Sequence, residues 1–102
     1  MNENKIQEMQ ILEQRLQNSL LQKQAFQMEL AETNSAMSEL EKSGDDVFKI
    51  IGQLMIKSEK SKIKEELENK QKILEMRIKS FDKQEEIIAN QLDKMREEIT
   101  QN

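Results

Sequence analysis

Two long stretches of the chain carry apolar residues at an average spacing of about three and a half positions. In the first stretch the recurring positions run from Met9 to Leu40, and in the second they run from Leu67 to Ile99. Most of them are apolar, and the residues between them are rich in Gln, Glu and Lys. Such a stripe, kept over several heptads, is typical of a coiled coil. We predict helices at about residues 4–42 and 60–101.

The two stripes match best when the chain folds back on itself at Gly52, so that the helices run antiparallel. Apolar positions then face apolar ones, and polar positions face polar ones. The predicted layers are Met9 with Met95, Leu12 with Leu92, Leu16 with Ile88, Ser19 with Glu85, Phe26 with Ile78, Leu30 with Leu74, Thr33 with Gln71 and Met37 with Leu67. At 1.5 Å per residue, each helix would be about 60 Å long, which predicts a rod.

Two layers of this register join a lysine to an apolar residue: Lys23 faces Phe81, and Lys64 faces Leu40. A lysine stem can cover an apolar neighbour while its ammonium extends into water. We therefore expect both lysines to lie along the helix pair with their charges solvated.

The helical pattern stops between the two stripes. Gly44 is placed to end the first helix as a glycine C-cap, and Ser58 or Ser61 can cap the start of the second. The segment between them, VFKIIGQLMI, is almost entirely apolar around Gly52-Gln53. A glycine that leads a two-residue turn between β-branched residues predicts a type II′ β-hairpin at about residues 47–57. The alternative is a hydrophobic bend, but connections between helices are usually short and polar.

Apolar residues occupy both faces of the predicted hairpin, and a two-stranded ribbon is only marginally stable in water. A pair of helices has no second core to cover it, so other chains must pair with it in a sheet or barrel. The predicted oligomer interface comprises Val47, Phe48, Ile50, Ile51, Gly52, Leu54, Met55 and Ile56.

The amino-acid composition excludes most other classes of function. The 102 residues include no Cys and no His, which excludes the usual zinc ligands, thiol nucleophiles and imidazole bases. A net charge of −4 provides no basic field for nucleic acid or an anionic membrane. No apolar run is long enough for a membrane span or a signal peptide. We predict a soluble cytoplasmic binding protein, not an enzyme, that needs no metal or cofactor.

Three segments together carry a family resemblance: LLQKQAFQMEL, ELEKSGDDVFKIIGQLMIKSEKSKIKEELENK and ILEMRIKSFDKQEEII. They resemble the β-type subunit of prefoldin, and the single hairpin argues against the α type. An archaeal β subunit is expected in preference to a eukaryotic paralogue. The resemblance implies a mainly α fold, in which two long antiparallel helices are joined by one β-hairpin. It also implies that hairpins of two α and four β subunits form a β-barrel platform carrying six coiled coils.

The same resemblance implies a function as an ATP-independent chaperone. Non-native client proteins would be held at the free tips of the coiled coils and passed to a group II chaperonin. The apolar residues nearest that end are the predicted client-binding residues Ile6, Met9, Leu12, Met95 and Ile99. Methionine suits a surface that must adapt to many sequences. Two alternatives remain: Met9 and Met95 merely complete the stripe, or clients bind on the inner faces near Leu21, Met28 and Met76.

A function from a different class is also compatible with the pattern. A structural or tethering coiled coil would join other proteins through one fixed partner groove. Such a protein would end in polar, capped helices or in a single specific apolar socket, whereas a chaperone needs adaptable apolar surface there. The apolar residues in the first and last turns favour the chaperone.

Overall fold

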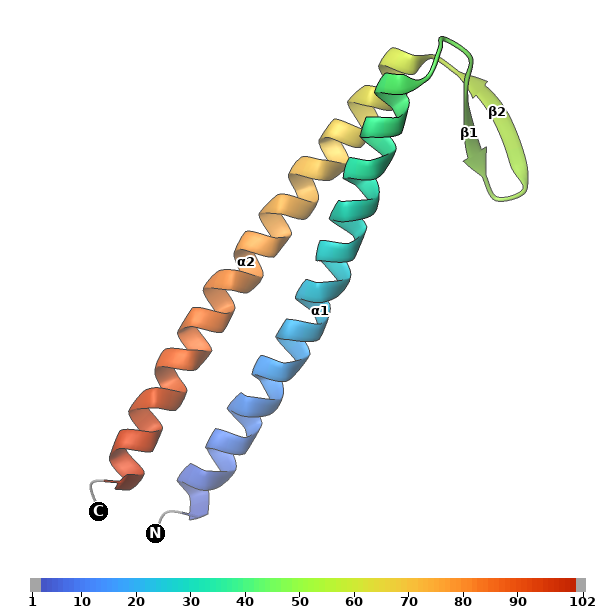
Figure 1. Ribbon diagram of the computed structural model, residues 1–102. Coiled ribbons are helices and arrows are strands. Elements are labelled where there is room, and N and C mark those ends of the chain that lie inside the picture. Colours follow the sequence, from blue (N-terminus) through green and yellow to red (C-terminus); the bar gives the residue numbers. More distant parts are fainter. Residues whose placement is uncertain (1–2, 101–102) are drawn as a thin grey trace. The chain divides into compact units, whose positions relative to one another are not determined.

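The computed structural model describes residues 3–100 of the chain. Figure 1 shows α1 (Glu3–Lys42) and α2 (Lys60–Thr100) joined by a hairpin of β1 (Val47–Ile51) and β2 (Leu54–Ser58). The predicted mainly α fold, with two long helices and one hairpin, is confirmed. The expected end of the second helix at residue 101 lies outside the described residues. Neither α1 nor α2 has an apolar stretch that could cross a membrane.

The chain divides into two compact units. The terminal unit comprises Met1–Phe26 and Arg77–Asn102, and the hairpin unit comprises Gln27–Met76. Every position of the two predicted stripes is buried or half-buried, whereas most residues between them are exposed. The stripe pattern therefore identifies the packed face of each helix correctly.

In the terminal unit, contacts between the helices show an antiparallel arrangement. Lys5 Nζ lies 2.8 Å from Glu98 Oε2, and Arg96 Nη2 lies 3.7 Å from Glu13 Oε1. The residue number on α2 falls as the number on α1 rises, as an antiparallel pair requires. Leu12 and Leu92 form the buried apolar core of this unit, with 8% and 3% of their surface exposed.

The terminal unit also contains an aromatic contact that spans two predicted layers. The rings of Phe26 and Phe81 lie 5.6 Å apart, and the Arg77 guanidinium carbon lies 5.3 Å from the centre of the Phe26 ring. Both distances are typical of favourable aromatic and cation–π contacts. Phe26 thus contacts Phe81 and also Arg77. Arg77 lies in the same turn of α2 as Ile78, the predicted layer partner of Phe26.

In the hairpin unit the helices are also antiparallel. Lys70 Nζ lies 3.4 Å from Glu29 Oε1, and Lys60 Nζ donates a hydrogen bond of 2.8 Å to the backbone oxygen of Ser43, so the residue number on α2 again falls as the number on the α1 side rises. Next to the first of these contacts, Gln71 Nε2 donates a hydrogen bond of 2.8 Å to Asn34 Oδ1. Leu40 and Leu74 are buried. Thr33 is buried too, and its hydroxyl donates to the backbone oxygen of Glu29 on the same helix, so it needs no partner on α2.

Close to the hairpin, Lys64 and Leu40 line the same pocket, as the predicted layer places them. Lys64 is exposed, in agreement with a lysine whose charge extends into water, whereas Ile63 and Lys60 are half-buried. Ile63 lines a different pocket, together with Lys49, Lys57 and Ser58 of the hairpin. Ile63 is therefore an additional half-buried apolar residue next to the hairpin, which the stripe did not predict.

The ends of the helices are capped differently from the prediction. Gly44 does not adopt a positive φ, so the expected glycine cap is wrong. The Ser43 hydroxyl instead donates to the Leu40 carbonyl at 2.7 Å, and Lys60 Nζ donates to the Ser43 carbonyl at 2.8 Å. A cation at this position also interacts favourably with the negative end of the helix dipole.

The expected serine caps of α2 are wrong as well. Ser58 belongs to β2 and Ser61 lies within the helix. Glu59 immediately precedes α2, and its carbonyl accepts hydrogen bonds of 3.1 Å from the backbone N–H groups of Lys62 and Ile63. Glu59 is therefore the N-cap residue.

The hairpin has the predicted turn. Ile51 pairs with Leu54 at its closed end, and Val47 pairs with Ser58 at its open end. Gly52 has a φ of 60°, and no other described residue has a positive φ. A positive φ at the first central residue alone is the geometry of a type II′ turn, which requires glycine there.

Candidate functional site

The hairpin exposes a continuous set of apolar side chains. Ile50 is 70% exposed, although isoleucine is among the residues most often buried in folded proteins. The exposed apolar side chains of this hairpin surface are Phe48, Ile50, Ile51, Leu54, Met55 and Ile56. Val47, which we expected to be uncovered, is only 8% exposed and is therefore covered within the chain itself.

The hairpin surface has two faces, because side chains alternate along a strand and paired residues share a face. Ile50 and Met55 form one cross-strand pair, and Ile51 and Leu54 form the next, on the opposite face. All four side chains are more than half exposed. Because both faces are apolar and uncovered, the hairpin surface has the properties of an interface.

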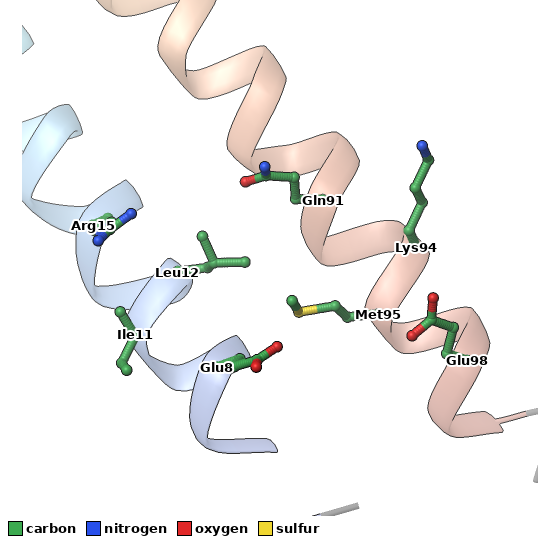
Figure 2. Close-up of a pocket in the computed structure, with 8 residues that line it drawn as sticks. All are labelled: Glu8, Ile11, Leu12, Arg15, Gln91, Lys94, Met95 and Glu98. Carbon is green, nitrogen blue, oxygen red and sulfur yellow. The ribbon is translucent and has the colours of Figure 1, made fainter. Parts of the chain in front are cut away.

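A second candidate site is a groove at the chain-terminal ends of α1 and α2. It has a volume of about 460 Å³ and is lined by Glu8, Ile11, Leu12, Arg15, Gln91, Lys94, Met95 and Glu98. Figure 2 shows Leu12 and Met95 pointing toward one another between the helices, with charged side chains around them. The terminal groove therefore has an apolar floor and a charged rim.

The predicted client-binding residues occupy different positions relative to the terminal groove. Leu12 and Met95 line it, whereas Ile6, Met9 and Ile99 are not among its lining residues. Met9, Met95 and Ile99 are half-buried, and Ile6 is 44% exposed. Leu12 is only 8% exposed, so most of its surface is covered by the protein and not by solvent.

Sequence reasoning missed part of the terminal groove. Ile11 contributes an apolar side chain that is 56% exposed, and the charged rim was not expected at all. Ile11 lies beside the stripe, in the same turn as Leu12. An apolar residue adjacent to the last layers of a stripe is the signal that could have identified it. The rim could not be identified in this way, because charged residues are common on every exposed helix face.

A polar cluster lies within the same terminal unit. Lys23, whose ammonium was expected to reach water, instead forms an ion pair with Asp82 and donates to Glu85 Oε2 at 3.3 Å. The hydrogen bond to Asp82 is the main cause that raises the pKa of Lys23. Burial opposes that increase, and Glu85 adds to it. Ser19 Oγ and Glu85 Oε1 are buried without a hydrogen-bond partner. The predicted stripe positions Ser19 and Glu85 thus each carry a buried polar atom that forms no hydrogen bond.

The off-stripe apolar residues offer no comparable site. Leu21, Met28 and Met76 are 63%, 67% and 70% exposed. They occupy heptad positions on the outer faces of their helices, away from the packed stripe. Single exposed apolar side chains of this kind are common on protein surfaces.

An antiparallel helix pair joined by one exposed apolar hairpin defines a distinctive class of coiled-coil subunit. The family described as prefoldin subunit matches residues 3–102, and the chain belongs to the prefoldin family. The chain is 38% identical over 86 residues to prefoldin subunit beta of Pyrobaculum aerophilum, which covers 82% of this chain and 68% of the relative. It is 32% identical over 95 residues to that of Sulfurisphaera tokodaii, covering 91% of this chain and 76% of the relative.

A solved structure shows the same arrangement. The crystal structure of the prefoldin beta subunit from Thermococcus strain KS-1 superposes with a TM-score of 0.90 at 32% sequence identity. The match covers 96% of this chain and 88% of the other. The resemblance to prefoldin β subunits is therefore confirmed, and with it the assignment to a chaperone family.

The polar cluster predicts a change in stability at high pH. Because the folded-state pKa of Lys23 is raised above 10.5, its contribution is complete below that pH and is lost as pH rises through the folded-state pKa. The free energy of unfolding of the parent should therefore fall relative to Lys23→Met above pH 10.5. Urea unfolding followed by circular dichroism measures both proteins.

Lys83→Met is the matched control, because Lys83 is exposed and forms no ion pair within residues 3–100. A difference between parent and Lys23→Met that stays constant through the alkaline range would contradict the assigned ion pairs.

Proposed function

We propose that the chain is a subunit of an ATP-independent cytoplasmic chaperone, a binding protein and not an enzyme. In this proposal the hairpin surface assembles with other prefoldin subunits, including an α-type partner, in a hexamer of two α and four β subunits. The chain-terminal ends of the helices hold non-native proteins and release them to a group II chaperonin. The observation that carries the proposal is the uncovered apolar hairpin in a member of the prefoldin family.

The energetics of the hairpin surface support assembly. Each large apolar side chain contributes roughly 1.5–3 kcal/mol when it moves from water into a packed core. Six such side chains are exposed on ten strand residues. Pairing of strand edges from several chains in a barrel buries them and satisfies the free backbone groups of each edge.

The first test of the proposal introduces a charge into the hairpin surface. Ile50→Asp or Ile56→Asp should give smaller species, because burial of an unpaired carboxylate in the assembled barrel is costly. Helix content should change little, because both residues are exposed on the strands and neither belongs to the stripes of α1 and α2. Light scattering measures the mass, with and without an α-type prefoldin subunit, and circular dichroism measures the helix content.

Ile73→Asp is the matched control, since Ile73 is 52% exposed on the outside of α2. Its mass should equal that of the parent. An unchanged mass for both hairpin variants would place the interface on the helices and contradict this part of the proposal.

The terminal ends of the helices have the properties of an adaptable binding surface. The groove is open to solvent, its floor is apolar, and Met95 is a flexible side chain that packs against varied shapes. Met9 and Ile99 are half-buried close to the ends of the described helices. A client segment can therefore contact apolar surface here without unfolding the helix pair.

The second test removes apolar surface from these ends and leaves the buried Leu12 in place, so that the helix pair remains stable. The variant changes four residues to Gln: Ile6, Met9, Met95 and Ile99. It should assemble normally but lose most of its ability to suppress aggregation of a chemically denatured test protein, measured by light scattering, because the exposed apolar surface is what binds the client. Single changes should have small effects, because several subunits contact one client and their contributions multiply.

The matched control changes four exposed apolar residues elsewhere to Gln: Leu21, Met28, Met76 and Ile87. This control should protect the test protein as well as the parent does. If the control loses protection and the first variant keeps it, clients bind along the helix faces. If neither variant loses protection, client capture at these surfaces is contradicted. Absence of protection by the parent assembly would favour a tethering coiled coil.

A further inference from the structure

The charged rim of the terminal groove carries an inference about which client segments it accepts, and this inference rests on the proposed function. We propose that the groove prefers a segment in which one large apolar side chain lies between a basic and an acidic residue. The apolar side chain would contact the floor formed by Leu12 and Met95. The two flanking charges would contact opposite parts of the rim.

The rim carries charges of opposite sign at its two ends. Glu8 and Arg15 both line the groove from α1 and are seven residues apart, which corresponds to about 10 Å along a helix. Figure 2 shows the Glu8 carboxylate beside Met95 and the Arg15 side chain on the far side of Leu12. The groove is therefore acidic at one end and basic at the other, and the apolar floor lies between them.

Some of the charged side chains on the rim already form an ion pair within the chain, and others do not. Glu98 adds a second carboxylate at the acidic end, but Lys5 Nζ lies 2.8 Å from it. Within residues 3–100, neither Glu8 nor Arg15 takes part in an ion pair. Lys94 lines the groove but points away from Leu12 in Figure 2. Glu8 and Arg15 are thus the two rim charges on α1 that are available to a bound segment.

Both α1 rim charges of the terminal groove lie on the same edge of the helix pair. On α1, Glu8 and Arg15 occupy the g position of the heptad, whereas Glu13 occupies the e position on the other edge. There, Glu13 pairs with Arg96 across the two helices at 3.7 Å. A client segment therefore reaches the floor from the edge that carries Glu8 and Arg15.

Charge complementarity on this rim affects selectivity more than overall affinity. Apolar contact with the floor supplies most of the binding free energy, and exposed ion pairs supply little. A segment with two basic flanks would place one cation beside Arg15, and a segment with two acidic flanks would place one carboxylate beside Glu8. Like-charge contacts of this kind discriminate between partners.

The experiment uses the whole 102-residue chain, assembled with an α-type prefoldin subunit, and four fluorescein-labelled peptides. All four share one central leucine motif, and their flanks are mixed, both basic, both acidic or neutral. Fluorescence anisotropy at low salt should give the tightest binding for the mixed flanks. The two uniformly charged peptides should bind about two- to fivefold more weakly. The differences should shrink as salt screens the exposed charges.

Two charge reversals then test the assignment to the rim. Glu8→Lys makes the rim mainly basic, so the preference should move to the peptide with acidic flanks. Arg15→Glu makes it mainly acidic, so the preference should move to the peptide with basic flanks. The controls Glu86→Lys and Lys83→Glu change the net charge equally at exposed positions of the same unit and should keep the parent preference.

The outcomes separate this inference from the proposed function. Equal affinity of the parent for all four peptides, or an unchanged preference in both reversals, would overturn the charge selectivity while leaving the apolar client site in place. If the parent binds none of the peptides, including the neutral one, client binding at the terminal groove is contradicted as well.

Discussion

Burial of one narrow apolar stripe on each helix, against the stripe of the other, is the interaction on which the rest of this protein depends. Residues 3–100 contain little other core: their buried apolar residues are Leu12, Leu40, Val47, Leu74 and Leu92. Four of these five belong to the two stripes. In proteins, most helix stability comes from packing of an amphipathic face and not from intrinsic propensity. Neither helix has another described element that could cover its stripe along the whole length.

The stripe also determines which surfaces remain available for binding. Because the helices bury their apolar faces against each other, the hairpin must be ordered by its own turn, in which only glycine easily adopts the φ of 60° at Gly52. Apart from Val47, the hairpin's apolar residues stay uncovered. At the chain-terminal ends, Leu12 and Met95 form the floor of an open groove. The assembly and the client binding that we propose therefore use separate surfaces of one small chain.

The sequence was sufficient to predict features that repeat or that depend on one special residue. The period of the stripes predicted the buried faces, and Gly52 predicted the hairpin and its turn type. Local features that depend on competition between neighbours were predicted less well. Lys60 and Ser43 cap α1 in place of a left-handed Gly44, and Glu59 caps α2 in place of a serine.

The polar parts of the sites were the least predictable. Whether the Lys23 ammonium extends to water or pairs with Asp82 and Glu85 depends on the positions of carboxylates on the other helix, which a register estimate does not supply. The rim of the terminal groove poses the same problem, because Glu8 and Arg15 resemble any other exposed charges until the groove is seen.

The most direct test of the account is disulfide formation between Leu30→Cys and Leu74→Cys in a single chain that contains no other cysteine. These positions are predicted layer partners on the packed faces of the hairpin unit, where facing core residues bring their Cβ atoms within reach of a disulfide. The account predicts a cross-link within one chain, seen as a faster-migrating monomer on non-reducing gel electrophoresis. Cross-links that form only between chains would contradict intrachain antiparallel pairing.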